Sequence, residues 1–115
     1  GEPIDVLPFG ATWPNQQTVA LFKSDEVEVI RLVLLTGKSM KEHEAPGDIT
    51  IQCIEGQLDI ALEGSSRTLN AGQLLFVAAH ARHSVTALAP SSALVTIVVK
   101  KVSARLLRFN PSGWI

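Results

Sequence analysis

The sequence is poor in residues on which several kinds of protein depend. It holds one cysteine and no tyrosine among 115 residues, so no disulfide can form within the chain. The single thiol, Cys53, lies in an apolar run, which is typical of a buried and inert cysteine. A chain with so little cysteine fits a reducing compartment, and we expect a cytoplasmic protein.

An excess of charge of one sign is also absent. Ten Lys and Arg residues stand against eleven Asp and Glu residues, for a formal net charge of -1. The basic residues are scattered, apart from Lys100 and Lys101, so the chain lacks the basic patch of a nucleic-acid-binding protein. No apolar run approaches the ~18 residues of a membrane helix. We therefore expect neither a nucleic acid nor a membrane as a partner.

The chain does have enough apolar material for one core. It is 46% hydrophobic and 18% charged, which is too apolar for a disordered chain, and its length corresponds to one domain. Residues 1–17 contain several prolines and no periodicity, so we expect an extended N-terminal arm with Phe9 and Trp13 as anchors. Residues 18–102 form the predicted domain. Residues 103–115 form a C-terminal tail, compatible with one short helix or an added strand.

Turn-forming residues recur from Gly37 to Pro90 at intervals of roughly nine residues, the spacing of short antiparallel strands. Within residues 58–62, Leu58, Ile60 and Leu62 alternate with less apolar residues, and residues 63–66 predict a hairpin turn onto residues 67–70. Other predicted strands are apolar on both faces; they span residues 28–35, 49–54, 74–78 and 93–100. The pattern predicts an all-β domain with two packed sheets, or with a partner covering one face.

The strand at 28–35 carries the argument for a partner. A domain this small cannot cover both of its apolar faces, and soluble monomers expose apolar patches of only a few hundred Å². We therefore predict a homodimer that buries well over ~1,000 Å² in total. The arm and Trp114 would supply aromatic residues to its interface.

Two histidines stand in fixed spacings with glycines. Five residues separate Gly37 from His43, and Gly56 follows Ile49 after six further residues. In these positions the chain resembles the first motif of the cupin superfamily, although Ala45 and Ile49 stand where that motif has a histidine and a glutamate. The second cupin motif is matched at Gly72 and His83. The proline, glycine and asparagine of that motif are replaced here by Ala78, His80 and Ala87, in this order.

The resemblance implies a single-domain jelly-roll β-barrel, a double-stranded β-helix, with a pocket at its mouth. Cupin enzymes typically hold Fe, Mn, Ni or Zn there with three histidines and a glutamate. Ala45 and Ile49 cannot donate an electron pair, so the usual metal site is depleted. His80 would supply a third nitrogen beside His43 and His83 in a repaired site. We expect no metal, or a weakly bound divalent transition metal (Zn, Ni, Mn or Fe).

Strand parity and the resemblance together predict the lining of the pocket, with Leu74 and Met40 as further contributors: His43, Ala45, Ile49, Ile51, Phe76, His83 and Val85. Such a pocket suits a small, partly hydrophobic ligand with one hydrogen-bonding or anionic end. We predict a small-molecule-binding or sensing cupin domain.

Two other interpretations stay open. One is a metal-dependent cupin enzyme, an oxygenase, isomerase or decarboxylase, that uses His43, His80 and His83. The other is a purely structural dimer whose side chains fill the barrel. The tyrosine acid of cupin sugar epimerases is absent, which leaves a histidine base as the route to catalysis without a metal. The sequence assigns no catalytic residue.

Overall fold

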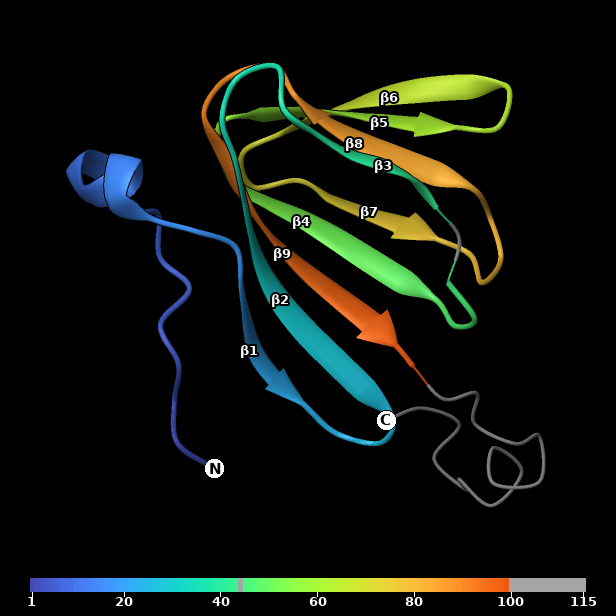
Figure 1. Ribbon diagram of the computed structural model, residues 1–115, viewed down its shortest axis with the longest axis horizontal. Helices are drawn as coiled ribbons and strands as arrows, with labels where there is room; N and C mark the ends of the chain where they lie inside the picture. Colours follow the sequence, from blue (N-terminus) through green and yellow to red (C-terminus); the bar gives the residue numbers. More distant parts are fainter. Residues whose placement is uncertain (44, 100–115) are drawn as a thin grey trace.

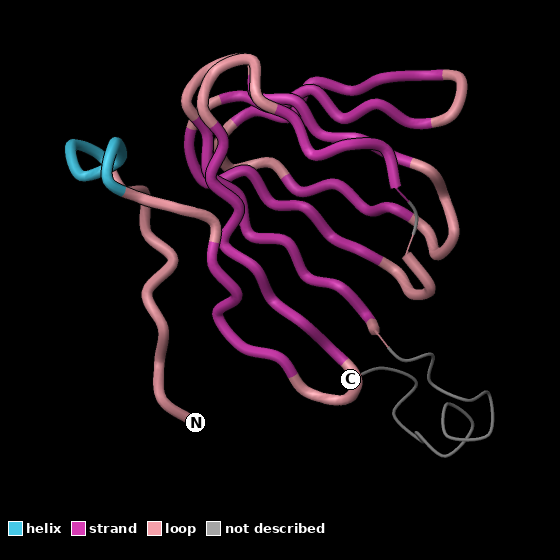
Figure 2. Tube along the Cα trace, viewed as in Figure 1, coloured by secondary structure: helices cyan, strands magenta, loops and turns pink. Residues whose placement is uncertain are grey.

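The computed structural model describes residues 1–43 and 45–99, without the side chains of residues 14 and 41–43. Strands dominate this part of the chain, with one short 3-10 helix before them (Figure 1, Figure 2). The elements are η1 (Gly10–Asn15), β1 (Val19–Lys23), β2 (Val27–Leu34), β3 (Ser39–His43), β4 (Ile49–Glu55), β5 (Gln57–Leu62), β6 (Ser65–Asn70), β7 (Leu74–Val77), β8 (His83–Ala87) and β9 (Ser91–Val98). No helix in the described ranges is long and apolar enough to cross a membrane.

The strands form two antiparallel sheets that face each other (Figure 1). The five-stranded sheet has the order β1-β2-β9-β4-β7, and the four-stranded sheet has the order β3-β8-β5-β6. Because β9 lies between β2 and β4, the last described strand joins two strands from the first half of the chain. The all-β jelly roll predicted from the sequence is confirmed.

The predicted strands are present, with ends that differ by at most two residues. The hairpin turn between β5 and β6 is shorter than expected, since it consists of Glu63 and Gly64 alone. Gly64 has a φ of 75°, a backbone conformation that glycine adopts without steric cost. The predicted C-terminal tail, including Trp114, lies outside the described residues.

The core lies between the two sheets and follows the alternation of each strand. On β4, Ile49, Ile51 and Cys53 are buried, while the residues between them are less buried. Leu58 and Ile60 of β5 meet them from the opposite sheet. Burial raises the pKa of the Cys53 thiol, so Cys53 is the buried, unreactive cysteine expected from the sequence.

The outer face of the five-stranded sheet carries a buried charge. Arg31 of β2 is only 3% exposed, and its Nη2 donates hydrogen bonds to Ser92 Oγ at 3.0 Å and to the Leu7 carbonyl at 2.7 Å. The Arg31 guanidinium also lies 4.1 Å from the centre of the Phe9 ring, a cation–π contact. Leu7 and Phe9 belong to the N-terminal segment, so this segment packs against the domain's own sheet.

Candidate functional site

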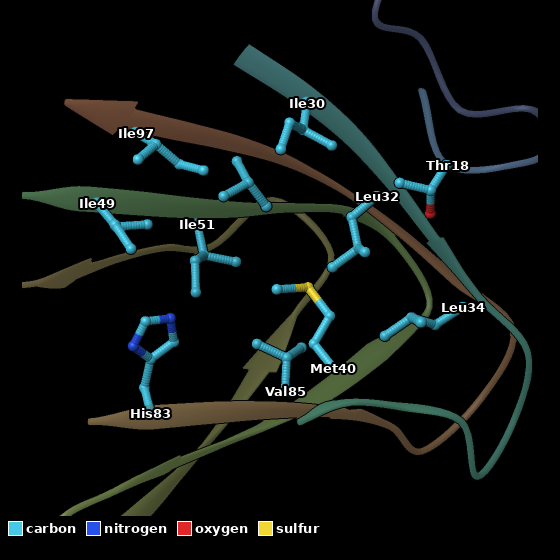
Figure 3. A pocket seen from close by; sticks show the side chains of 11 residues that line it. Thr18, Ile30, Leu32, Leu34, Met40, Ile49, Ile51, His83, Val85 and Ile97 are labelled. Atoms are coloured by element: carbon cyan, nitrogen blue, oxygen red, sulfur yellow. The ribbon is translucent and has the colours of Figure 1, made fainter. Parts of the chain in front are cut away.

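A cavity of about 320 Å³ lies between the two sheets (Figure 3). Its walls are the inward-facing side chains of five strands, and Thr18 joins them from just before β1. Apart from Thr18 and His83, every described lining residue is apolar; the full set is Thr18, Ile30, Leu32, Leu34, Met40, Ile49, Ile51, His83, Val85, Val95 and Ile97.

His83 supplies the polar group at one end of the cavity. It is the first residue of β8 and is 3% exposed, and its ring points across the cavity toward Ile49 and Ile51 (Figure 3). Its Nδ1 lies 3.2 Å from the Ala81 carbonyl oxygen. Because a carbonyl only accepts, Nδ1 is the donor of this hydrogen bond.

The second motif histidine lies beside the first along the backbone. In the pairing of β3 with β8, His43 and His83 are register partners. The two histidines from separate motifs therefore occupy neighbouring positions on adjacent strands, at the end of the cavity where β8 begins.

His80 does not line this cavity. It lies in the turn between β7 and β8, where it is exposed and has a φ of 65°. Its N–H donates to the Ala45 carbonyl at 2.8 Å, which ties the turn to the segment before β4. Ala45 packs against the core, but it is not among the residues that line the cavity either. The predicted places of His80 and Ala45 around the pocket therefore need correction.

Phe76 and Leu74 also lie elsewhere than expected. In the pairing of β7 with β4, Phe76 is the partner of Thr50, whose neighbours Ile49 and Ile51 point into the cavity. Phe76 and Leu74 therefore face outward, and they are 59% and 64% exposed. The prediction that Phe76 lines the pocket is wrong. Ile49, Ile51, His83 and Val85 do line it, as does Met40.

The donors in the described part of the chain do not fit a cupin metal centre. A mononuclear site normally needs at least three protein ligands, and no three His, Cys, Asp or Glu residues among the described ones gather closely enough. Ile49 stands where the motif has its carboxylate, and its side chain lies in the cavity facing His83 (Figure 3). An aliphatic group at that point offers no lone pair.

Sequence reasoning missed half of the cavity wall. Ile30, Leu32 and Leu34 of β2 alternate with outward-facing residues, so the signal was present in the sequence. The sequence carried no signal for which strands lie opposite one another, because that depends on pairing between distant segments. Thr18 carried no signal at all, since it precedes the first strand.

Comparison with known proteins identifies the fold. No protein-family model matches the chain, and a search of curated proteins finds no match. A cupin superfamily protein from Desulfitobacterium hafniense is 25% identical, with a TM-score of 0.71 over 75% of this chain and 80% of that one. An RmlC-like cupin from Desulfovibrio desulfuricans is 19% identical, with a TM-score of 0.71 over 85% of this chain and 97% of that one.

KdgF from a Halomonas species is also 19% identical, with a TM-score of 0.65 over 73% of this chain and 80% of that one. At such low sequence identities, these proteins are related by their shared backbone fold. Together with the two motif histidines on adjacent strands, it shows that the chain is a small cupin domain.

Proposed function

We propose that this cupin domain binds a small, largely apolar molecule in the cavity between its sheets. The observation that carries the proposal is a cavity of about 320 Å³ with apolar walls and one buried imidazole. An apolar cavity of about 150 Å³ accommodates benzene, so roughly a dozen non-hydrogen atoms fit in this one.

The apolar walls and the imidazole of the cavity would contribute differently to ligand binding. Contact with the aliphatic walls removes apolar ligand surface from water, which stabilises the complex by about 25 cal/mol per Å². His83 makes one end of the cavity polar, so a ligand with one polar end would lie in a single orientation. Open space among these side chains supports binding over a purely structural role, in which the side chains would fill the barrel themselves.

A metal-dependent enzyme, whether oxygenase, isomerase or decarboxylase, is the second candidate. The register that pairs His43 with His83 favours it, because a metal site on this fold draws its histidines from neighbouring positions on adjacent strands. The exposed His80 and the aliphatic Ile49 count against it, since neither adds a donor inside the cavity. Binding or sensing without chemistry therefore has the stronger support.

The test compares the same substitution at two core positions. Ile51 is 1% exposed and lines the cavity, whereas Ile60 is 0% exposed and does not. Ile51→Phe should fold, because open space receives the larger ring, and the ring should reduce the space left for a ligand next to His83 and Val85. Ile60→Phe should overpack the core and lower the free energy of unfolding by about 1–3 kcal/mol, yet leave the cavity open.

Binding would be followed by NMR, with indole, 4-ethylphenol and 1-octanol as probes. We expect amide shifts around Ile49, His83 and Val85 in the wild type and in Ile60→Phe, and weaker binding, with a changed pattern of shifts at these amides, in Ile51→Phe. Identical affinity and shifts in the wild type and Ile51→Phe, or shifts that cluster outside the cavity, would contradict the proposal.

A further inference from the structure

A second hollow adjoins the cavity at the end away from His83. This outer groove has a volume of about 290 Å³, and it shares Thr18 and Leu34 with the cavity lining. Figure 3 shows Thr18 and Leu34 at one end of the cavity and His83 at the other. The cavity and the more open groove are therefore neighbours, separated by Thr18 and Leu34, with the buried imidazole at the far end of the cavity.

The outer groove differs from the cavity in its chemistry. Its polar lining consists of Trp13, Gln16, Gln17 and Lys38, besides Thr18. Lys38 is the single charged residue among the described lining residues, and none of these is acidic. The indole Nε1 of Trp13 is buried and has no hydrogen-bond partner among the described residues. The groove thus offers a cation and amides, and its described lining holds no acidic side chain that would oppose an anion.

Thr18 cannot serve an anion at the junction. Its hydroxyl donates to the Val33 carbonyl at 3.2 Å and accepts the Val33 N–H at 2.9 Å. A hydroxyl has one proton to donate, and Val33 already receives it. A negative group that leaves the apolar cavity at this end would meet its first positive charge at Lys38.

The backbone of Lys38 is held in place. Its N–H donates to the Leu35 carbonyl at 2.9 Å, and Gly37 has the φ of 80° that this tight turn requires. The Gly37 N–H donates to the Ala87 carbonyl at 2.8 Å, and the Ala87 N–H donates to the Lys38 carbonyl at 2.9 Å. The turn is therefore fixed to the end of β8, which reduces the ordering that binding requires.

We propose that the cavity and the outer groove form one site for an amphiphilic organic anion. An apolar chain or ring would occupy the cavity, and a carboxylate would lie in the groove beside Lys38. This inference rests on the proposed function, since it assumes that the cavity takes a ligand. It adds the chemical class of that ligand and places its charged end opposite the motif histidines.

The experiment compares straight-chain carboxylates with the matching alcohols, from four to ten carbons, by calorimetry at low salt. We expect octanoate to bind the wild type about tenfold more tightly than 1-octanol, the size of one charge-assisted hydrogen bond in a partly exposed site. Lys38→Gln should remove this preference and leave 1-octanol binding unchanged. Lys23→Gln, at an exposed lysine outside the groove, should keep the preference.

The other outcomes separate the inference from the proposed function. If both ligands bind the wild type equally well, the anion site is wrong while the cavity still binds. If the preference for octanoate survives Lys38→Gln but is lost in His83→Gln, the carboxylate lies at the histidine end, which also overturns the inference. If no carboxylate or alcohol in the series binds, the proposed function itself fails, and the inference fails with it.

Discussion

The Nη2 atom of Arg31 on β2 lies 3.4 Å from Oε2 of Glu55 at the end of β4. This pair ties the N-terminal arm to the five-stranded sheet, because Glu55 also accepts the N–H groups of Phe9 and Gly10 at 3.0 and 3.3 Å and the hydroxyl proton of Ser92. Burial lowers the pKa of Arg31 against the opposing effect of Glu55. Hydrogen bonds from the arm, from Ser92 and from Arg31 thus converge on the one carboxylate of Glu55.

Glu55→Gln tests this attachment. The substitution leaves a buried guanidinium without a counter-charge, and it weakens the acceptor for Phe9 and Gly10. We expect the free energy of unfolding, measured with urea, to fall by about 2 kcal/mol, and the Phe9 and Gly10 amides to exchange faster with solvent. Glu63→Gln, in the exposed β5–β6 turn, should change stability by less than about 0.5 kcal/mol. Equal effects of the two variants would show that the cluster does not hold the arm.

The same carboxyl predicts an acid dependence. Burial raises the pKa of Glu55, but hydrogen bonds from Ser92, Phe9 and Gly10 and the charge of Arg31 outweigh it, so the pKa lies below its ordinary value of 4.5. A lowered carboxyl pKa stabilises the fold above the ordinary value, and this contribution is lost as the pH falls through the lowered one. The stability difference between the wild type and Glu55→Gln should therefore shrink below about pH 4.5. A constant difference down to pH 2 would contradict this.

Short-range patterns predicted most of the fold. The β5–β6 hairpin follows from the local alternation of apolar residues and from a glycine in the turn. The number and length of the short strands follow from the regular spacing of turn-forming residues. Pairings between distant segments, such as β9 between β2 and β4, are not encoded in any one segment. Here the spacing of Gly37, His43, Gly72 and His83 supplied the topology through its resemblance to cupins.

The site was predictable only where alternation was clear. On β4 it placed Ile49 and Ile51 on one face, and both line the cavity. Residues 74–77 are all apolar, so nothing local distinguishes the buried Val77 from the exposed Phe76. The arm was expected to be anchored by Phe9, but the Arg31–Glu55 pair that receives it was not predictable, because the two residues lie on separate strands.

Gly56 should tolerate no side chain. It joins β4 to β5 with a φ of 84°, and an added Cβ would overlap the Pro90 carbonyl oxygen and the Ser91 hydroxyl. We expect Gly56→Ala to lower the free energy of unfolding by about 3 kcal/mol or to prevent folding. Gly64→Ala is the matched control, because Gly64 has a φ of 75° but open space around it; it should cost about 1 kcal/mol in urea denaturation. If the two variants are equally stable, the close approach at Gly56 is absent.

Metal content is expected to be low. Ala45 and Ile49 occupy two ligand positions of the cupin motif, and the exposed His80 lies outside the cavity, so a transition metal would depend largely on water for its coordination. Elemental analysis of protein purified without chelator should find far less than one equivalent of Zn, Ni, Mn or Fe, and His80→Ala should not change it. About one equivalent that disappears in His80→Ala would instead support the repaired three-histidine site.

The outer face of the five-stranded sheet provides the argument for a homodimer. Val19 and Phe22 of β1 lie at one flank of this face, and Leu74 and Phe76 of β7 lie at the other. Each of these side chains is about half exposed or more, although the arm already covers Arg31 in the middle. An apolar face of this kind on a small domain is best removed from water by a second copy of the chain.

We therefore expect light scattering at micromolar concentration to give twice the 12.4 kDa of the single chain. Phe22→Glu and Phe76→Glu each place a charge on one flank of this face. The variant whose flank lies in the dimer interface should be a monomer, because a desolvated, unpaired charge opposes association. Leu88→Glu is the control, because Leu88 is 46% exposed in the β8–β9 connection, outside that sheet, and it should leave the dimer intact. A wild-type mass of 12.4 kDa would mean that this face needs no cover beyond the chain's own arm.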